Sequence, residues 1–175
     1  KYYVRGASLI GWVYYDSVNV TINSLPTKPD IGLDTAFCDG NNITLDAGTY
    51  DAYQWNDGSS DQTILVSTTG EYFVVISDAN NCKTSDTIQL TVHSLPAKPD
   101  IGLDAAFCDG NTITLDAGTY STYQWNNGST IQTILISISG EYFVLVSDTN
   151  NCSNSDSISI TVNLNPGITL NKTNE

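Results

Sequence analysis

The sequence predicts an all-β fold, built from small β-sandwiches that follow one another head to tail along the chain. Three observations lead to this prediction. Apolar, β-branched and aromatic residues alternate with polar ones at a period of two, and clusters of Gly, Asn and Asp interrupt them every few residues. The whole pattern beginning at Ser24 recurs from Ser94, and no segment keeps the period of a helix.

The recurrence defines the organisation of the chain. Residues 24–93 and 94–163 align without a gap, and 50 of the 70 positions are identical. Residues 1–23 align with 71–93, so we expect them to be the C-terminal strands, F and G, of a preceding partial repeat. Residues 164–175 resemble the start of a following repeat or a linker. The expected parts are therefore 1–23, repeat 1 (24–93), repeat 2 (94–163) and 164–175, joined by linkers that contain proline.

Each strand of one copy is predicted from its own segment. Strand A is the apolar run before the turn at Asp39-Gly40-Asn41, strand B is the alternating Ile-Thr-Leu-Asp, and strand C carries Tyr-x-Trp before the turn at Asn56-Asp57-Gly58. Strand E is Thr-Ile-Leu-Val, strand F opens after Gly70, and strand G follows the turn at Asp78–Asn81. The predicted ranges in repeat 1 are 31–37, 43–47, 52–56, 62–67, 71–77 and 85–92, and adding 70 gives repeat 2. Six or seven short strands in this length are typical of a small sandwich.

Composition excludes several classes of function. The formal charge is −13 with a pI near 4.1, and both nucleic acid and an anionic membrane surface repel such a chain. No apolar run approaches the ~20 residues of a membrane helix, so we expect no membrane insertion. The chain starts without Met or a signal peptide, and we expect it to be an internal piece of a longer protein.

Enzymatic activity is not expected. The single histidine, His93, lies at the end of a strand and is Asn163 in the other copy. No serine lies in a Gly-x-Ser-x-Gly elbow. Carboxylates are abundant, but a catalytic pair needs a pocket that a sandwich of this size rarely provides. We expect no cofactor; calcium is the one metal that the acidic residues make conceivable, with Asp30, Asp34 and Asp78 as weak candidates.

The pattern ITLDAG, YQW, G-EYFV and SD-x-NNC resembles the immunoglobulin-like and PKD-like repeats of large secreted proteins. It is most similar to the surface adhesins of gliding and biofilm-forming Bacteroidota. The resemblance implies a seven-stranded sandwich, type IX export to the cell outer membrane and the cell surface, and a role as an adhesive stalk. It also implies O-glycans at Asp-Ser/Thr sites, with Ser17, Thr35, Thr87 and Ser157 as candidates; the alternative is that these Asp-Ser/Thr pairs only cap turns.

Two aromatic features have alternative interpretations. Trp55 and Trp125 could stack on sugars, but we favour a place in the core, as in immunoglobulin-like domains. Strand F is apolar on both faces. If Tyr72, Val74 and Ile76 point inward, their neighbours form an outward stripe that either contacts a partner or is covered locally. The contact candidates in the two copies are Phe73, Val75, Phe143 and Leu145.

Four cysteines raise a question of pairing, since export exposes them to oxidising conditions. Bonds within each copy would join Cys38 to Cys82 and Cys108 to Cys152. In an immunoglobulin-like sandwich, however, the A–B turn and the F–G turn lie at opposite ends, ~17–23 Å apart, whereas a disulfide needs Cα atoms within about 7 Å. We therefore favour a bond between copies, from Cys38 to Cys152, and keep the other pairing open.

The favoured function is a non-enzymatic, structural or adhesive repeat region of a large extracellular protein. One alternative is a carbohydrate-binding or spacer module of a secreted enzyme. The other is a self-assembling surface filament, in which strand F packs against other copies. The expected partners are neighbouring repeats of the same chain, surface or substratum glycans, and other copies of the protein.

Overall fold

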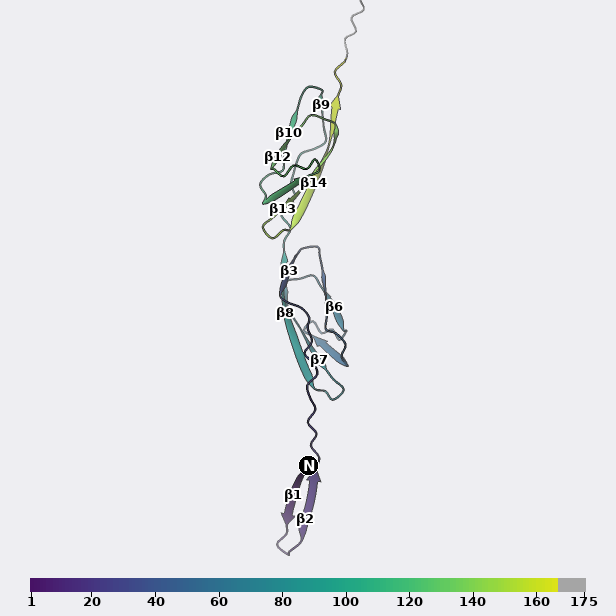
Figure 1. The fold of residues 1–175 in the computed structure, drawn as a ribbon, viewed down its shortest axis with the longest axis vertical. Helices are drawn as coiled ribbons and strands as arrows, with labels where there is room; N and C mark the ends of the chain where they lie inside the picture. The colour runs from purple at the N-terminus through teal and green to yellow at the C-terminus, as the bar shows by residue number, and fades with distance from the viewer. Residues whose placement is uncertain (167–175) are drawn as a thin grey trace, which may run out of the picture. The chain divides into compact units, whose positions relative to one another are not determined.

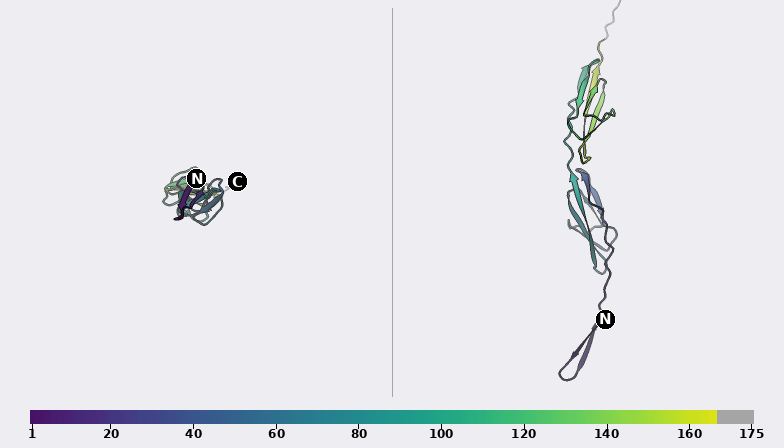
Figure 2. Two further views of the ribbon diagram at one scale, coloured as in Figure 1. Left: turned by 90° about the horizontal axis from the view of Figure 1, so that it is seen from below. Right: turned by 60° about the vertical axis from the view of Figure 1, so that its left-hand side comes forward.

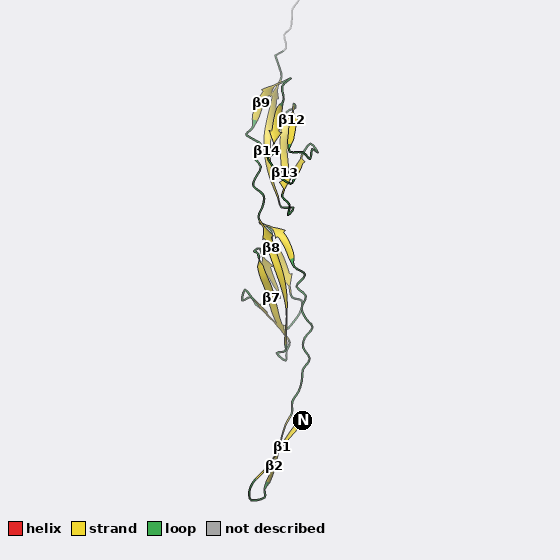
Figure 3. Cartoon of the chain, turned by 90° about the vertical axis from the view of Figure 1, so that its left-hand side faces the viewer, coloured by secondary structure: helices red, strands yellow, loops and turns green. Residues whose placement is uncertain are grey.

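The computed structural model describes residues 1–166, apart from the side chain of Tyr14, and every regular element in that range is a β-strand (Figure 3). Within the same range no helix is long and apolar enough to cross a membrane. The predicted segment 164–175 lies mostly outside the described residues. The all-β prediction is confirmed.

Repeat 2 forms two sheets (Figure 1). One sheet has four strands in the order β11-β13-β14-β9, and the other pairs β10 with β12. Strand β9 runs parallel to β14, with Ala105 opposite Ile160, and all other pairs are antiparallel. The bounds are β9 (Ala105–Cys108), β10 (Ile113–Asp116), β11 (Thr122–Trp125), β12 (Thr133–Ile136), β13 (Gly140–Ser147) and β14 (Ser153–Asn163).

Repeat 1 has the same strand order, β3-β8-β7-β5 in one sheet and β4-β6 in the other. Its antiparallel ladders keep the register of repeat 2: Ile43 lies opposite Val66, as Ile113 lies opposite Ile136. The bounds are β3 (Thr35–Cys38), β4 (Ile43–Asp46), β5 (Ala52–Trp55), β6 (Thr63–Val66), β7 (Gly70–Ser77) and β8 (Lys83–His93).

Each complete repeat buries an apolar core between its two sheets, which the right-hand view of Figure 2 shows as two layers in repeat 2. Trp125 is 2% exposed, and its indole Nε1 donates to the carbonyl of Ile131 at 2.9 Å. Trp55 is buried equally and donates to the carbonyl of Asp61. The core interpretation of both tryptophans is confirmed. The cluster in repeat 2 contains Ile101, Leu115, Ala117, Trp125, Ile134, Ile136, Val144, Val146, Ile158 and Ile160.

A tyrosine near the start of strand F, which is β7 in repeat 1 and β13 in repeat 2, bonds to the corner between strands E and F in each sandwich. The Tyr142 hydroxyl donates to the carbonyl of Ile138 at 3.0 Å, and the Tyr72 hydroxyl donates to the carbonyl of Thr68 at 3.2 Å. This contact across the E–F corner is a hallmark of the immunoglobulin fold, as is the tryptophan on strand C. Together with the strand order of both repeats and the parallel pairing of β9 with β14 in repeat 2, this contact makes residues 24–163 two tandem immunoglobulin-like β-sandwiches.

The N-terminal strands β1 (Tyr2–Ala7) and β2 (Val13–Val18) form an antiparallel hairpin of their own. Tyr2 faces Val18, as Tyr72 faces Ile88 in repeat 1, so the hairpin has the register of β7 and β8. Its apolar side chains are exposed, however: Val4 is 65% exposed, whereas the equivalent Val74 is fully buried. The hairpin therefore has the pairing of strands F and G without the sheets that would cover it.

Strand A differs from the prediction. It was expected over 31–37 but begins at Thr35. Gly32 has φ of 100°, which is outside the β region, and the Asp30 carboxylate accepts its N–H at 3.0 Å. The carboxylate of Asp34 then accepts the N–H of Gln89 at 2.8 Å. Side chains thus take the place of ladder bonds before β3. Each described repeat has six strands, where the resemblance implied seven.

Contacts divide the described chain into two compact units. The first comprises residues 1–35 and 42–90. The second comprises residues 36–41 and those from 91 onward. The short segment 36–41, which carries Cys38, therefore belongs to the same unit as repeat 2 although its sequence belongs to repeat 1.

Candidate functional site

The feature that most distinguishes this chain is a disulfide between its two sequence copies. Cys38, the last residue of β3, is bonded to Cys152, which precedes β14, with Cα atoms 5.5 Å apart. Cys82 and Cys108 are free thiols. The structure therefore contains the pairing that the sequence favoured.

Disulfide pairing within a copy is excluded by the length of strand G, which is β8 in repeat 1 and β14 in repeat 2. Cys108 lies opposite Asn163 at the far end of β14, whereas Cys152 precedes the first residue of the same strand. Eleven residues of β-strand at ~3.3 Å each hold these two positions about 35 Å apart. In repeat 1, Asp39 donates its N–H to the carbonyl of His93 at the far end of β8, while Cys82 precedes that strand.

The bond closes a large loop. Its cysteines have a sequence separation of 114, and a loop of that size loses about 5 kcal/mol of unfolded-state entropy in the chain-entropy model. The bond therefore contributes to stability mainly by restricting the unfolded chain. It also links the two sequence copies covalently at a second point, in addition to the backbone.

In each repeat, an aspartate near the start of strand G binds the proline-containing linker segment with which that repeat begins. In repeat 2 the Asp156 carboxylate accepts the N–H of Ile101 at 3.1 Å and pairs with Lys98 at 2.7 Å. Partial burial alone would raise the pKa of Asp156, but the hydrogen bonds from Lys98, Ile101 and Ser157 outweigh it and lower the pKa below its ordinary value. Interaction with Asp156 in turn raises the pKa of Lys98.

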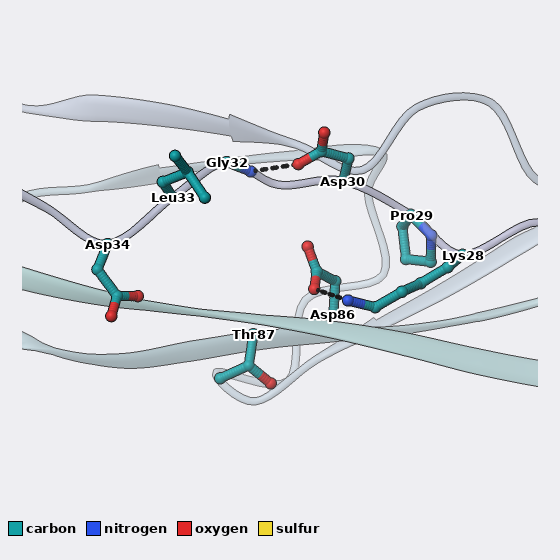
Figure 4. A pocket seen from close by; sticks show the side chains of 8 residues that line it. All are labelled: Lys28, Pro29, Asp30, Gly32, Leu33, Asp34, Asp86 and Thr87. Carbon is teal, nitrogen blue, oxygen red and sulfur yellow. Dashed lines mark hydrogen bonds and ion pairs between the residues drawn. The ribbon is translucent and has the colours of Figure 1, made fainter.

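The equivalent contacts in repeat 1 border a cavity of about 620 Å³ (Figure 4). The Lys28 ammonium points at the Asp86 carboxylate, and the Asp30 carboxylate turns back onto the N–H of Gly32. Within residues 1–166, no group of three or more His, Cys, Asp or Glu side chains could hold a metal ion. The third calcium candidate, Asp78, accepts the N–H groups of Asn80 and Cys82 in the F–G turn. Calcium binding stays a prediction.

The predicted stripe on strand F is partly exposed. Phe143 is 47% exposed and Phe73 is 37% exposed, while Val75 and Leu145 are half-buried. In repeat 2 the stripe borders a hollow of about 590 Å³, lined by Gln124, Trp125, Asn126, Gly128, Phe143 and Leu145. The contact role of the stripe stays a prediction. Of the residues expected to point inward, Val74 and Ile76 are fully buried, whereas Tyr72 is only half-buried. The same holds for Tyr142 in repeat 2 and for Tyr53 and Tyr123 on strand C, and the hydroxyls of all four tyrosines bond to backbone atoms.

All four O-glycosylation candidates are exposed: Ser17, Thr35, Thr87 and Ser157. Thr87 lies directly across the ladder from Phe73, and Ser157 lies directly across from Phe143. These hydroxyls are therefore open to solvent and adjacent to the strand F stripe, and their modification stays a prediction.

Sequence reasoning missed the ion pairs that bind the linkers, Lys28 with Asp86 and Lys98 with Asp156. No pattern in the sequence indicated them, because 50 of the 70 aligned positions recur at the same spacing and these four residues do not stand out among them. Sequence reasoning also missed the role of the tyrosine hydroxyls, for which the Gly-x-Tyr at the start of strand F was the indication.

Comparison with known proteins yields structural neighbours only. No protein-family model matches the chain, and no curated protein matches it. Murine CEACAM1b is similar at 16% identity and a TM-score of 0.35, covering 73% of this chain and 95% of that one.

Two further neighbours have several domains. The N-terminal four Ig domains of Dscam1 isoform 6.9 match at 15% identity and a TM-score of 0.34, over 91% of this chain and 53% of that one. The insect immune protein hemolin matches at 14% and 0.38, over 77% of this chain and 46% of that one. The chain thus spans about half the length of these two. The fold is assigned from the strand order and the tyrosine corners of each repeat, not from these scores.

Proposed function

We propose that the chain is a structural repeat region of a large extracellular protein, an adhesin stalk whose work is mechanical and non-enzymatic. The observation that carries the proposal is the Cys38–Cys152 bond, which joins one repeat covalently to the next. Such bonds persist in oxidising compartments and are rare in the cytosol. The chain's excess of negative charge supports an exposed, soluble location.

The repeats themselves support a spacer role. Each complete copy buries its own apolar core between two sheets, as an independently folded spacer does. The two tryptophans on strand C, Trp55 and Trp125, are buried and are not available to stack on a sugar, whereas Trp12 in the N-terminal hairpin is 66% exposed. This disfavours the carbohydrate-binding alternative at strand C.

The test uses the native protein on intact cells. Cells are treated with an impermeant biotin reagent and with iodoacetamide, and the captured protein is digested without reduction for peptide mapping. We expect biotinylated protein that contains the Cys38–Cys152 peptide, and loss of attachment when the region is deleted. An unlabelled protein in intact cells, with both cysteines alkylated, would contradict the proposed location.

A second candidate function is self-association through strand F. The hollow beside Phe143 supports it, since this exposed ring and Leu145 border the hollow on a surface that polar side chains would otherwise occupy. The test compares the double variant Phe73→Ser with Phe143→Ser against the parent chain by analytical ultracentrifugation. Self-association that is lost in the variant at an unchanged melting temperature supports the candidate; a parent chain that is monomeric at high concentration refutes it.

A further inference from the structure

The four cysteines occupy two kinds of position. Cys38 and Cys108 end strand A and are called the A–B cysteines. Cys82 and Cys152 end the turn after strand F and are called the F–G cysteines. The existing bond joins the A–B cysteine of repeat 1 to the F–G cysteine of repeat 2. The two thiols that remain, Cys82 and Cys108, are one of each kind.

The F–G turn has the same structure whether its cysteine is bonded or free. The Asp148 carboxylate accepts the N–H of bonded Cys152 at 2.9 Å, and the Asp78 carboxylate accepts the N–H of free Cys82 at 2.8 Å. The residue before each cysteine, Asn151 or Asn81, has positive φ, 62° and 60°. The free turn therefore already has the backbone of the bonded one.

The A–B turn is equally preformed. The Asn41 side-chain amide donates to the carbonyl of bonded Cys38 at 3.2 Å, and the Asn111 amide donates to the carbonyl of free Cys108 at 3.1 Å. The next residue, Asp39 or Asp109, donates its N–H to the end of strand G at 2.8 Å in both copies. Cys108 is exposed and Cys82 is half-buried, so both thiols are open to a partner.

We propose that Cys82 and Cys108 are the two open halves of a repeating cystine, in which the A–B cysteine of each repeat bonds the F–G cysteine of the next repeat along the chain. The partner of Cys108 is an F–G cysteine of a following immunoglobulin-like repeat. The partner of Cys82 is an A–B cysteine of a preceding one. Pairing of two A–B or two F–G cysteines is not expected, because the existing bond joins unlike positions.

Trp12 marks a repeat in which this bond is not formed. The N–H of Ser8 donates to the carbonyl of Trp12 at 2.9 Å, as the N–H of Asp78 donates to that of Cys82 at 3.1 Å. Trp12 therefore occupies the F–G cysteine position of the hairpin. The partial repeat that contains it can accept no bond from a repeat before it.

Bond formation is a two-electron oxidation, with a small disulfide of the glutathione class as the oxidant. The Cys108 thiolate attacks one sulfur of this oxidant and releases one reduced small thiol, which leaves a mixed disulfide. The partner thiolate then attacks the Cys108 sulfur and releases the second small thiol. Two protein thiols are oxidised and one small disulfide is reduced. The inference depends on the proposed extracellular location in one respect only, which is that an oxidising compartment supplies this small disulfide.

The test adds one repeat to the full chain. A third copy, identical to 94–163, is inserted between Asn163 and Leu164, and the protein is refolded in a glutathione redox buffer. Remaining thiols are alkylated, and peptides are mapped without reduction. We expect two cystines, Cys38–Cys152 and Cys108 with the F–G cysteine of the inserted copy. Cys82 and the inserted A–B cysteine should be alkylated.

The matched control carries tryptophan at the F–G position of the inserted copy, as the hairpin does at Trp12. In this control Cys108 should be alkylated, while Cys38–Cys152 still forms and reports correct folding. Alkylated Cys108 in the first protein, beside an intact Cys38–Cys152 bond, would overturn the proposal, as would a bond from Cys108 to any other position. Neither outcome bears on the cell-surface labelling that tests the proposed function.

Discussion

Breaking the Cys38–Cys152 bond should change how far the chain extends under force. When the chain is pulled from its two ends, tension follows the shortest covalent path, which crosses from Cys38 to Cys152 through the disulfide. Residues 39–151 then carry no tension, whatever the arrangement of the two units. The bond thus removes residues 39–151 from the force path, while strand β14 of repeat 2 remains in it.

The hidden length follows from the sequence separation of 114 between the two cysteines. At ~3.6 Å per extended residue, the bond removes about 400 Å from a chain that would otherwise extend to about 600 Å. Single-molecule force spectroscopy with the chain tethered at both ends measures this difference. On the same scale, we expect a total contour length of about 200 Å in oxidising buffer and of about 600 Å for Cys38→Ser or after reduction.

The controls separate this bond from other pairings. Cys82→Ser removes a free thiol, so it should leave the oxidised contour length unchanged. Bonds within each copy would instead hide two loops of roughly 44 residues, about 160 Å each. An oxidised chain that is shortened by about 320 Å, or by nothing, would refute this force path.

Three further predictions concern single residues. Trp55→Ala should cost about 3–5 kcal/mol in urea unfolding followed by circular dichroism, because the indole is fully packed; a cost below ~1 kcal/mol would contradict its place in the core. Tyr142→Phe should cost about 1 kcal/mol, because it removes only the hydroxyl bond to Ile138, and an unchanged urea midpoint would show that the corner contributes nothing. Asp156 has a lowered pKa, so its stabilisation is complete above the ordinary value of 3.8 and is lost as the pH falls below it. Asp156→Asn should therefore lower the melting temperature at pH 7 and leave it less dependent on pH between 5 and 2; parallel melting curves for the two proteins across this range would refute the assignment.

The fold was predictable where local pattern and packing agree. Strand B as Ile-Thr-Leu-Asp, with Leu115 buried in repeat 2, and strand C with Trp125 follow directly from period-two alternation. The beginning of strand A was not predictable from alternation. At Gly32 an apolar segment continues past a residue with positive φ, and only the structure shows that the Asp30 carboxylate takes up the backbone N–H there.

The site was predictable only as far as topology could be inferred. The opposite placement of the A–B and F–G turns follows from the immunoglobulin-like order of strands, and it disfavoured Cys38–Cys82 on the sequence alone. The linker contacts were not predictable, because a lysine and an aspartate as distant in sequence as Lys98 and Asp156 give no local pattern. The hydrogen bond of the Tyr142 hydroxyl was not predictable either, because its acceptor, the carbonyl of Ile138, comes within reach only through the folding of the E–F corner.

Pairing between copies also keeps the two repeats joined when the chain is cut in the linker. Bonds within copies would leave residues 83–107, which include the linker, outside any disulfide loop, and one cut there would separate the two repeats. The observed bond encloses the linker, so the fragments of a single cut remain joined. If the A–B cysteine at Cys108 is bonded onward to a following repeat, the next loop opens before the first closes at Cys152. Successive loops then overlap, and no single cut beyond Cys38 within the bonded repeats separates them. A protease site placed after Ser94 tests the first step, since the cut chain should run as one band without reductant and as two with it.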